Sequence, residues 1–302
     1  MEIKDLEYIR AVCECKSITR ASRQLYLTPQ GLSKIIKNVE NELNTTLFIR
    51  TPSGMELTES GKYLYEQLPE LLDSYAAMAS EIRCIEQSQN HEIDLLSAYG
   101  ILRLVTPECL EAFREEYPHI TLNYREYPDR EVDRLFRQGQ GNVAFNVGNN
   151  RCAYAESDIM DRFEIKLLVN RSHPFCGRES VTVEDLKGQK LYLESTEFNI
   201  HHLIVEECRS HGFDPDIVFQ TSGFGLCHKM VQKNHGISVT MDFMFDDMYK
   251  TNLVTIPFAD GPFYWETCIL KREGSVPNPD VELFCAYVKN WMQAIHRNEI
   301  QR

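Results

Sequence analysis

The chain has 302 residues, of which 43% are hydrophobic and 25% are charged, and its formal net charge at pH 7 is −13. This length predicts two or three folded units. The acidic balance excludes a protein that is basic throughout, so any contact with nucleic acid must come from a local patch. No apolar run approaches the roughly 20 residues that span a bilayer, and no secretory apolar segment follows the charged residues 1–5. We therefore expect a cytoplasmic protein without membrane contact.

Three helices are predicted at the start of the chain. The first, within residues 1–15, has one apolar side, made by Leu6, Ile9, Val12 and Cys13. In residues 17–25, apolar and small side chains recur three and four residues apart, so one side of a short helix can face inward. Thr28 can cap a third helix, in which Pro29 suits the first position.

Residues 17–39 contain no Asp or Glu, although they contain Arg20, Arg23, Lys34 and Lys37. A surface that faces phosphates requires such a local absence of acid. The pattern predicts a helix-turn-helix that docks on double-stranded DNA, and the alternative is a plain helix pair within a core. The predicted DNA-binding residues are Thr28, Gln30, Ser33, Lys34, Lys37 and Arg50.

A two-stranded wing is predicted after the helices. Residues 47–50 and 55–58 are short extended segments, and residues 51–54 between them contain Pro and Gly, which favour a turn. Arg50 lies at the base of this wing, where a cation can reach a flanking phosphate or the minor groove.

This N-terminal segment resembles the DNA-binding domain of the LysR-type transcriptional regulators of bacteria. The matching positions are Leu6, Ala11, Val12, Ser17, Ala21, Leu25, residues 28–33, residues 38–43, Leu47, Phe48, Arg50 and residues 57–61. The chain has Pro29-Gln30 where the family commonly has Gln-Pro, which leaves open the side chain that reads the first base. It has Asn44 where a turn glycine is common.

The resemblance implies a DNA-binding transcriptional regulator whose activity is modulated by a small-molecule effector. It implies operator DNA, the effector and a second copy of the chain as partners, with further association into a tetramer and RNA polymerase as a further candidate partner. It implies no cofactor and no enzymatic activity.

Residues 58–61 open a long predicted helix with an apolar seam. The seam residues recur at alternating steps of four and three, as in a heptad repeat, which predicts a homodimeric coiled coil. They are Leu64, Leu68, Leu71, Tyr75, Met78, Ile82 and Ile85. Pro69 predicts a bend in this helix. The alternative is that the seam packs on its own domain.

The polar residues 87–90 mark a boundary, after which predicted strands and helices alternate, as in α/β proteins with mainly parallel sheets. The whole chain is therefore predicted as an α/β fold with a winged helix-turn-helix at 1–60, a linker helix at 61–89 and an effector-binding domain at 90–302. Residues 148–161 and 259–262 are interpreted as crossings between two lobes. Lobe one spans about 90–161 plus 263–302 and lobe two about 162–262, similar to periplasmic binding proteins.

The predicted effector-binding residues follow strands at 93–98, 190–193 and 217–220, because ligands bind such sheets at the carboxyl ends of the strands. They are Tyr99, Gly100, Glu194, Ser195, Thr196, Phe198, Ser222 and Phe224. Nearby helix N-termini favour a carboxylate, whereas Glu194 would repel a wholly anionic ligand, so the expected effector is a carboxylate or amphoteric molecule. The alternative is that the hydroxyl groups only cap helices.

The sequence gives little support for catalysis, metal binding or redox sensing. The glycine-rich nucleotide loops and the common zinc-protease and serine-hydrolase motifs are absent. His201, His202 and Glu206 have a spacing that could hold a metal, but exposed helices commonly show it, so no metal is expected. Ten cysteines in a cytoplasmic chain are expected to be thiols. One alternative is a redox-sensing regulator using Cys176, Cys208 or Cys227. Another is a solute-binding module or an enzyme, which would leave the first sixty residues unexplained.

Overall fold

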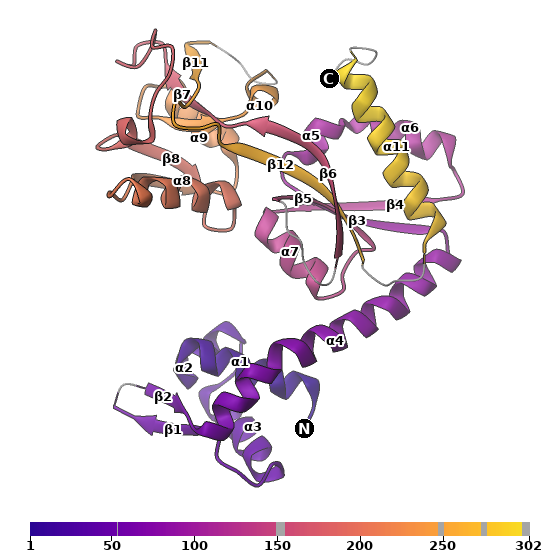
Figure 1. Cartoon of the computed structure of the whole chain (residues 1–302). Helices are drawn as coiled ribbons and strands as arrows, with labels where there is room; N and C mark the ends of the chain where they lie inside the picture. Colours follow the sequence, from indigo (N-terminus) through magenta and orange to yellow (C-terminus); the bar gives the residue numbers. More distant parts are fainter. Residues whose placement is uncertain (53, 149–154, 247–250, 273–276, 298–302) are drawn as a thin grey trace. The chain divides into compact units, whose positions relative to one another are not determined.

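The computed structural model describes residues 1–302 except residues 53, 149–154, 247–250, 273–276 and 298–302 (Figure 1). It forms two compact units, Met1–Ala79 and Ser80–Arg302. The division falls inside helix α4 (Glu59–Gln89), which continues from the first unit into the second. Among the described residues, no helix is long and apolar enough to cross a membrane.

The first unit is a winged helix-turn-helix. Its elements are α1 (Ile3–Cys15), α2 (Ile18–Gln24), α3 (Pro29–Glu42), β1 (Phe48–Thr51), β2 (Gly54–Leu57) and the first part of α4. Ser17 and Thr28 cap α2 and α3, because their hydroxyl oxygens accept hydrogen bonds from the amides of Arg20 at 3.4 Å and Gly31 at 3.1 Å. The core between the helices includes Leu6, Val12, Ala21, Leu32 and Ile36.

Two contacts fix the wing to the helices. The amide of Met55 donates to the carbonyl of Lys16 at 3.0 Å. The Glu40 carboxylate accepts hydrogen bonds from the amides of Leu47 at 2.7 Å and Phe48 at 3.2 Å. Glu40 is the first acidic residue after the acid-free segment, and its carboxylate therefore holds the start of the wing against α3.

The start of α4 explains part of the resemblance found in the sequence. The Thr58 hydroxyl donates to the carbonyl of Thr46 at 2.6 Å and accepts from the amide of Gly61 at 3.0 Å. A Cβ at Gly61 would lie 2.2 Å from the carbonyl oxygen of Leu47, so glycine allows α4 to start close to β1. Asn44, which stands where a turn glycine is common in the family that the sequence resembles, has φ of 49°. Asn tolerates this left-handed conformation better than most residues.

The predicted apolar seam of α4 is divided. Leu68 is 1% exposed and packs with Leu64 and Leu72 against the core of the first unit. The prediction that Leu68 faces a partner is therefore wrong, because this turn of α4 closes the core of its own unit. Five seam residues are instead 38–56% exposed: Leu71, Tyr75, Met78, Ile82 and Ile85.

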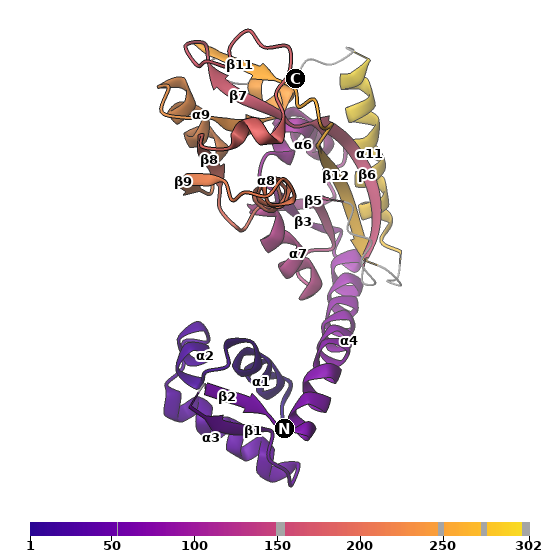
Figure 2. The same ribbon diagram turned by 60° about the vertical axis from the view of Figure 1, so that its left-hand side comes forward.

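The second unit has two lobes. In lobe one, five strands lie in the order β4 (Thr121–Tyr127), β3 (Glu92–Ala98), β5 (Val143–Val147), β12 (Tyr264–Arg272) and β6 (Ala155–Glu164). Its helices are α5 (Ile101–Val105), α6 (Pro107–Glu116), α7 (Asp129–Arg137) and α11 (Pro279–His296). Figures 1 and 2 show α7 on one face of this sheet and α6 and α11 on the other.

Lobe two is built on two small sheets. In one, β7 (Lys166–Asn170) lies between β10 (Ser238–Thr240) and β11 (Leu253–Ile256). In the other, β8 (Lys190–Glu194) pairs with β9 (Asp216–Thr221). The helical segments are η1 (Val183–Leu186), α8 (Asn199–Ser210), α9 (Phe224–Gln232) and α10 (Asp242–Asp246).

Two sequence expectations for this unit are corrected. The sheets are not mainly parallel: β12 runs antiparallel to β5 and β6, and β7 runs antiparallel to both neighbours. Residues 155–161 belong to the edge strand β6 and not to a crossing, and residues 149–154 of that predicted crossing lie outside the described residues. An edge strand tolerates polar residues because one side faces solvent. The chain instead passes from lobe one to lobe two at Ile165, whose amide donates to the carbonyl of Phe263 at 2.8 Å, and it returns between β11 and β12, where the crossing at residues 259–262 was predicted.

Candidate functional site

The first candidate surface is a groove at the start of α3 in the first unit. It has a volume of about 470 Å³ and is lined by Ser17, Ile18, Thr19, Pro29, Gln30, Ser33, Arg50, Thr51, Gly54 and Met55. It therefore contains three of the predicted DNA-binding residues, Gln30, Ser33 and Arg50. The Arg50 guanidinium donates to the Ser33 hydroxyl at 3.3 Å, which places the cation of the wing beside α3.

The other three predicted DNA-binding residues lie outside this groove. Lys34 and Lys37 are exposed on α3, and the Thr28 hydroxyl is engaged as the cap of α3. The sequence reasoning missed Ser17 and Thr19, which bring the start of α2 into the groove. Their position at a helix start was the available signal, because the starts of α2 and α3 both line the groove.

The second candidate site lies between the two lobes of the second unit. Both carboxylate oxygens of Asp129, at the start of α7, accept a hydrogen bond from the amide of Asn199 at 3.0 Å. The Asn199 side-chain amide donates to the carbonyl of Val147 at 3.0 Å, and the amide of Arg130 donates to the carbonyl of Glu197 at 3.2 Å. These contacts join lobe one to the N-terminus of α8 in lobe two. We call them the interlobe clamp.

Two buried carboxyl groups lie at this clamp. Asp129 is 3% exposed, and burial raises its pKa to about 7 although the Asn199 amide opposes the shift. Glu194 is 4% exposed, and burial, with a smaller contribution from the charge of Asp129, raises its pKa to about 7. The clamp therefore holds two acids in one poorly solvated region, which favours their protonated forms or a positively charged neighbour.

Four of the predicted effector-binding residues meet where the lobes touch. The rings of Tyr99 and Phe198 stack with centroids 6.3 Å apart and an interplanar angle of 26°. Gly100 has φ of 93°, and a Cβ there would lie 2.9 Å from the Met244 methyl and 3.1 Å from the Phe224 ring. Glycine therefore lets the end of β3 approach lobe two closely.

The other four predicted effector-binding residues are not part of this contact. Glu194 is buried at the clamp, as described above. Ser195 is half-buried and its amide donates to the carbonyl of Thr221 at 2.8 Å. Thr196 and Ser222 are exposed, and the carbonyl of Thr196 lies 2.8 Å from Nε2 of His202.

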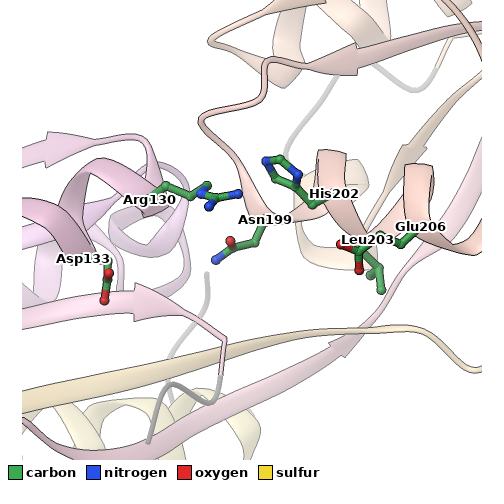
Figure 3. Close-up of a pocket in the computed structure, with 6 residues that line it drawn as sticks. All are labelled: Arg130, Asp133, Asn199, His202, Leu203 and Glu206. Carbon is green, nitrogen blue, oxygen red and sulfur yellow. The ribbon is translucent and has the colours of Figure 1, made fainter. Parts of the chain in front are cut away.

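A pocket of about 520 Å³ opens beside the clamp, between α7 and α8 (Figure 3). It is lined by Arg130, Asp133, Asn199, His202, Leu203 and Glu206, none of which was predicted from the sequence as an effector contact. The rule of strand ends, applied also to β4, would have led to Asp129 and Arg130, since both lie within three residues of the end of that strand.

Two of the three candidate redox cysteines are deeply buried. Cys208 and Cys227 are 0% exposed, and burial raises their pKa to about 11 and about 12. Because the thiolate is the reactive form, these two residues are poorly suited to sense an oxidant. Cys176 is half-buried in the segment after β7.

Comparison with known proteins agrees with this architecture. Residues 3–62 match the model of the bacterial regulatory helix-turn-helix protein, lysR family, and residues 86–293 match the LysR substrate binding domain. The chain is 29% identical over 278 residues to the uncharacterized HTH-type transcriptional regulator YwbI of Bacillus subtilis, covering 90% of this chain and 91% of that protein. It is 24% identical over 247 residues to the hydrogen peroxide-inducible genes activator of Dickeya chrysanthemi, covering 79% of this chain and 78% of that protein.

The fold is also that of a solved regulator. HinK, a LysR family transcriptional regulator from Pseudomonas aeruginosa, aligns with a TM-score of 0.57 at 21% identity, covering 97% of this chain and 99% of that chain. The second of the two family models alone spans more than half of the chain. The chain thus belongs to the LysR family of DNA-binding transcriptional regulators, with an N-terminal helix-turn-helix domain and a C-terminal effector-binding domain.

Proposed function

We propose that this regulator binds operator DNA in the cytoplasm as a dimer, and that a small molecule bound between the two lobes changes its activity. The interlobe clamp is the observation that carries this proposal. Three short contacts converge on one helix start, so a ligand that competes with them can shift the balance between a closed and an open arrangement of the lobes. A metabolite that binds the folded chain should raise its melting temperature, which a thermal-shift screen can detect.

The charge at the clamp narrows the chemistry of the effector. The N-terminus of α8 would favour an anion, but Asp129 already occupies it. Because Asp129 and Glu194 are both buried, a ligand that carries an ammonium group or several hydroxyl donors would relieve their desolvation. Tyr99, Phe198 and Phe224 offer apolar contacts beside them. We therefore favour an amphoteric or hydroxylated effector over a simple carboxylate.

Helix α7 offers a route from this cleft to the linker helix. At its C-terminal end, the guanidinium of Arg83 on α4 donates to the carbonyl of Gly139 at 2.7 Å. Arg272 donates to the carbonyls of Phe136 at 2.8 Å and Gln140 at 2.7 Å. Cations at a helix C-terminus complement its dipole. A displacement of α7 at the clamp would therefore act on α4, which continues into the DNA-binding unit.

On the DNA side, Gln30→Ala should relax sequence discrimination, at a cost of about 1–3 kcal/mol for the preferred operator, because Gln30 lies exposed at the start of α3. Arg50→Ala or Lys37→Ala should instead weaken binding to every sequence and lower the salt slope by about one for each phosphate that is no longer neutralised. Fluorescence anisotropy across a salt titration measures both effects. Lys62→Ala is the control, since Lys62 pairs with Glu59 on α4. Wild-type affinity and slope in all three DNA-site variants would refute the assignment.

For the dimer, replacing Leu71 and Met78 together by Glu should give a monomer, because both side chains belong to the exposed part of the apolar seam. Light scattering at micromolar concentration measures the mass. Ala77→Glu provides the comparison, since Ala77 is exposed on α4 but lies outside the seam. The interface lies elsewhere if the double variant keeps the wild-type mass.

The clamp also predicts a pH dependence. The pKa of Asp129 rises from 3.8 to about 7 on folding, so the folded second unit holds a proton that the unfolded chain has released. The contribution of Asp129 to the free energy of unfolding should therefore fall as pH rises to about 7. In Asp129→Asn, melting curves from about pH 5 to about pH 8 should lose this contribution, while those of Glu194 and of His228, whose pKa burial lowers to about 4, remain.

The control for this experiment is Asp133→Asn on the same helix, where Asp133 forms a surface ion pair with Arg137 at 3.6 Å. It should retain the wild-type dependence on pH. Indistinguishable curves for Asp129→Asn and wild type would show that the clamp does not bury an acid in solution.

A further inference from the structure

A cluster of two histidines and an aspartate lies at the amino edge of the lobe-one sheet, at the opposite ends of the strands from the clamp. His91 directly precedes β3 and His119 lies just before β4. Since Glu92 pairs with Thr121 in parallel register, the two segments that carry the histidines enter the sheet side by side. Asp280, in the first turn of α11, completes the cluster.

The donor atoms are close enough to share one cation. Nδ1 of His91 lies 3.0 Å from an Asp280 carboxylate oxygen, and one donor atom from each of the three residues lies within 4.8 Å of the other two. Metal–nitrogen and metal–oxygen bonds of about 2.0–2.2 Å place ligand atoms about 3.3 Å apart in a tetrahedron. The His91–Asp280 pair already meets this spacing. A change of rotamer at His119, which is exposed, would bring its ring nitrogen into range.

Other contacts hold the cluster in place. The carbonyl of His91 accepts a hydrogen bond from the amide of Thr121 at 2.8 Å, which fixes the backbone between α4 and β3. The amide of Asp280 donates to the side chain of Asn278 at 3.0 Å, and the Asp280 side chain is 12% exposed. The rings of His91 and His119 meet edge to face with centroids 5.6 Å apart. A divalent cation would be bound by neutral imidazoles and would offset the charge of the carboxylate.

We propose that His91, His119 and Asp280 form a site for a divalent transition metal, with water completing its coordination. Two imidazoles and one carboxylate suit zinc, cobalt or nickel, whereas magnesium and calcium prefer sets of oxygen ligands. The site would join the chain that leaves α4 to the starts of β4 and α11. Bound metal would therefore stabilise the part of lobe one that the linker helix enters.

The test uses the untagged full-length protein, freed of metal with a chelator and titrated with Co²⁺. The wild type should bind one equivalent with visible d–d absorption but no thiolate charge-transfer band, and Zn²⁺ should displace it. His119→Ala and Asp280→Asn should each weaken the affinity for Co²⁺ by about ten-fold or more. They should also abolish the rise in melting temperature that Zn²⁺ gives the wild type.

His296→Ala is the matched control, because His296 also pairs with an aspartate, Asp161, at 2.8 Å but lies outside the cluster. It should bind Co²⁺ as the wild type does. The proposal is overturned if wild-type protein binds no Co²⁺, if the bound Co²⁺ shows a thiolate band, or if folded His119→Ala retains wild-type affinity.

Discussion

The effector domain depends on the way helix α7 is held at both ends. At its start, the Asp129 carboxylate binds the first amide of α8 in the other lobe. At its end, the guanidinium groups of Arg83 and Arg272 bind the carbonyl of Gly139, just beyond the helix, and that of Phe136 in its last turn. A nine-residue helix is too short to be stable alone, so these contacts and its packing on the sheet determine where it lies. A ligand that displaces one end of α7 would therefore displace the whole helix.

The clamp is also a point of opposing forces. The hydrogen bonds favour closure of the lobes, whereas burial of Asp129 and Glu194 opposes it, because each carboxyl group loses solvent. In the proposed mechanism, such a balance keeps two arrangements of the lobes close in free energy, which is what a small molecule needs in order to change their populations. The stacking of Tyr99 on Phe198 adds an apolar contact to the closed arrangement. The proposed regulation therefore rests on the free-energy cost of burying the Asp129 and Glu194 carboxyl groups at the clamp.

Local signals in the sequence predicted local structure well. Thr28 and Pro29 identified the start of α3, and residues 58–61 identified the start of α4, because capping depends on a few adjacent residues. Long-range contacts were harder to predict. Heptad spacing could not show that Leu68 closes its own core while Leu71 stays exposed, since the two positions share one pattern. The rule of strand ends points to Asp129 but not to its partner Asn199, and no sequence pattern brings His119 together with His91 and Asp280, because these contacts join segments far apart in the chain.

A double-mutant cycle tests most directly whether α7 couples the cleft to the DNA-binding unit. Asp129→Ala removes the clamp at one end of α7, and Arg83→Gln removes the contact with α4 at the other; the affinity for operator DNA is measured for both single variants and for the double variant. If α7 transmits the change, the effects should be non-additive by at least about 0.5 kcal/mol, because Asp129→Ala has little left to alter once Arg83 is gone. Effects that add within about 0.3 kcal/mol, in proteins that remain folded, would contradict the coupling.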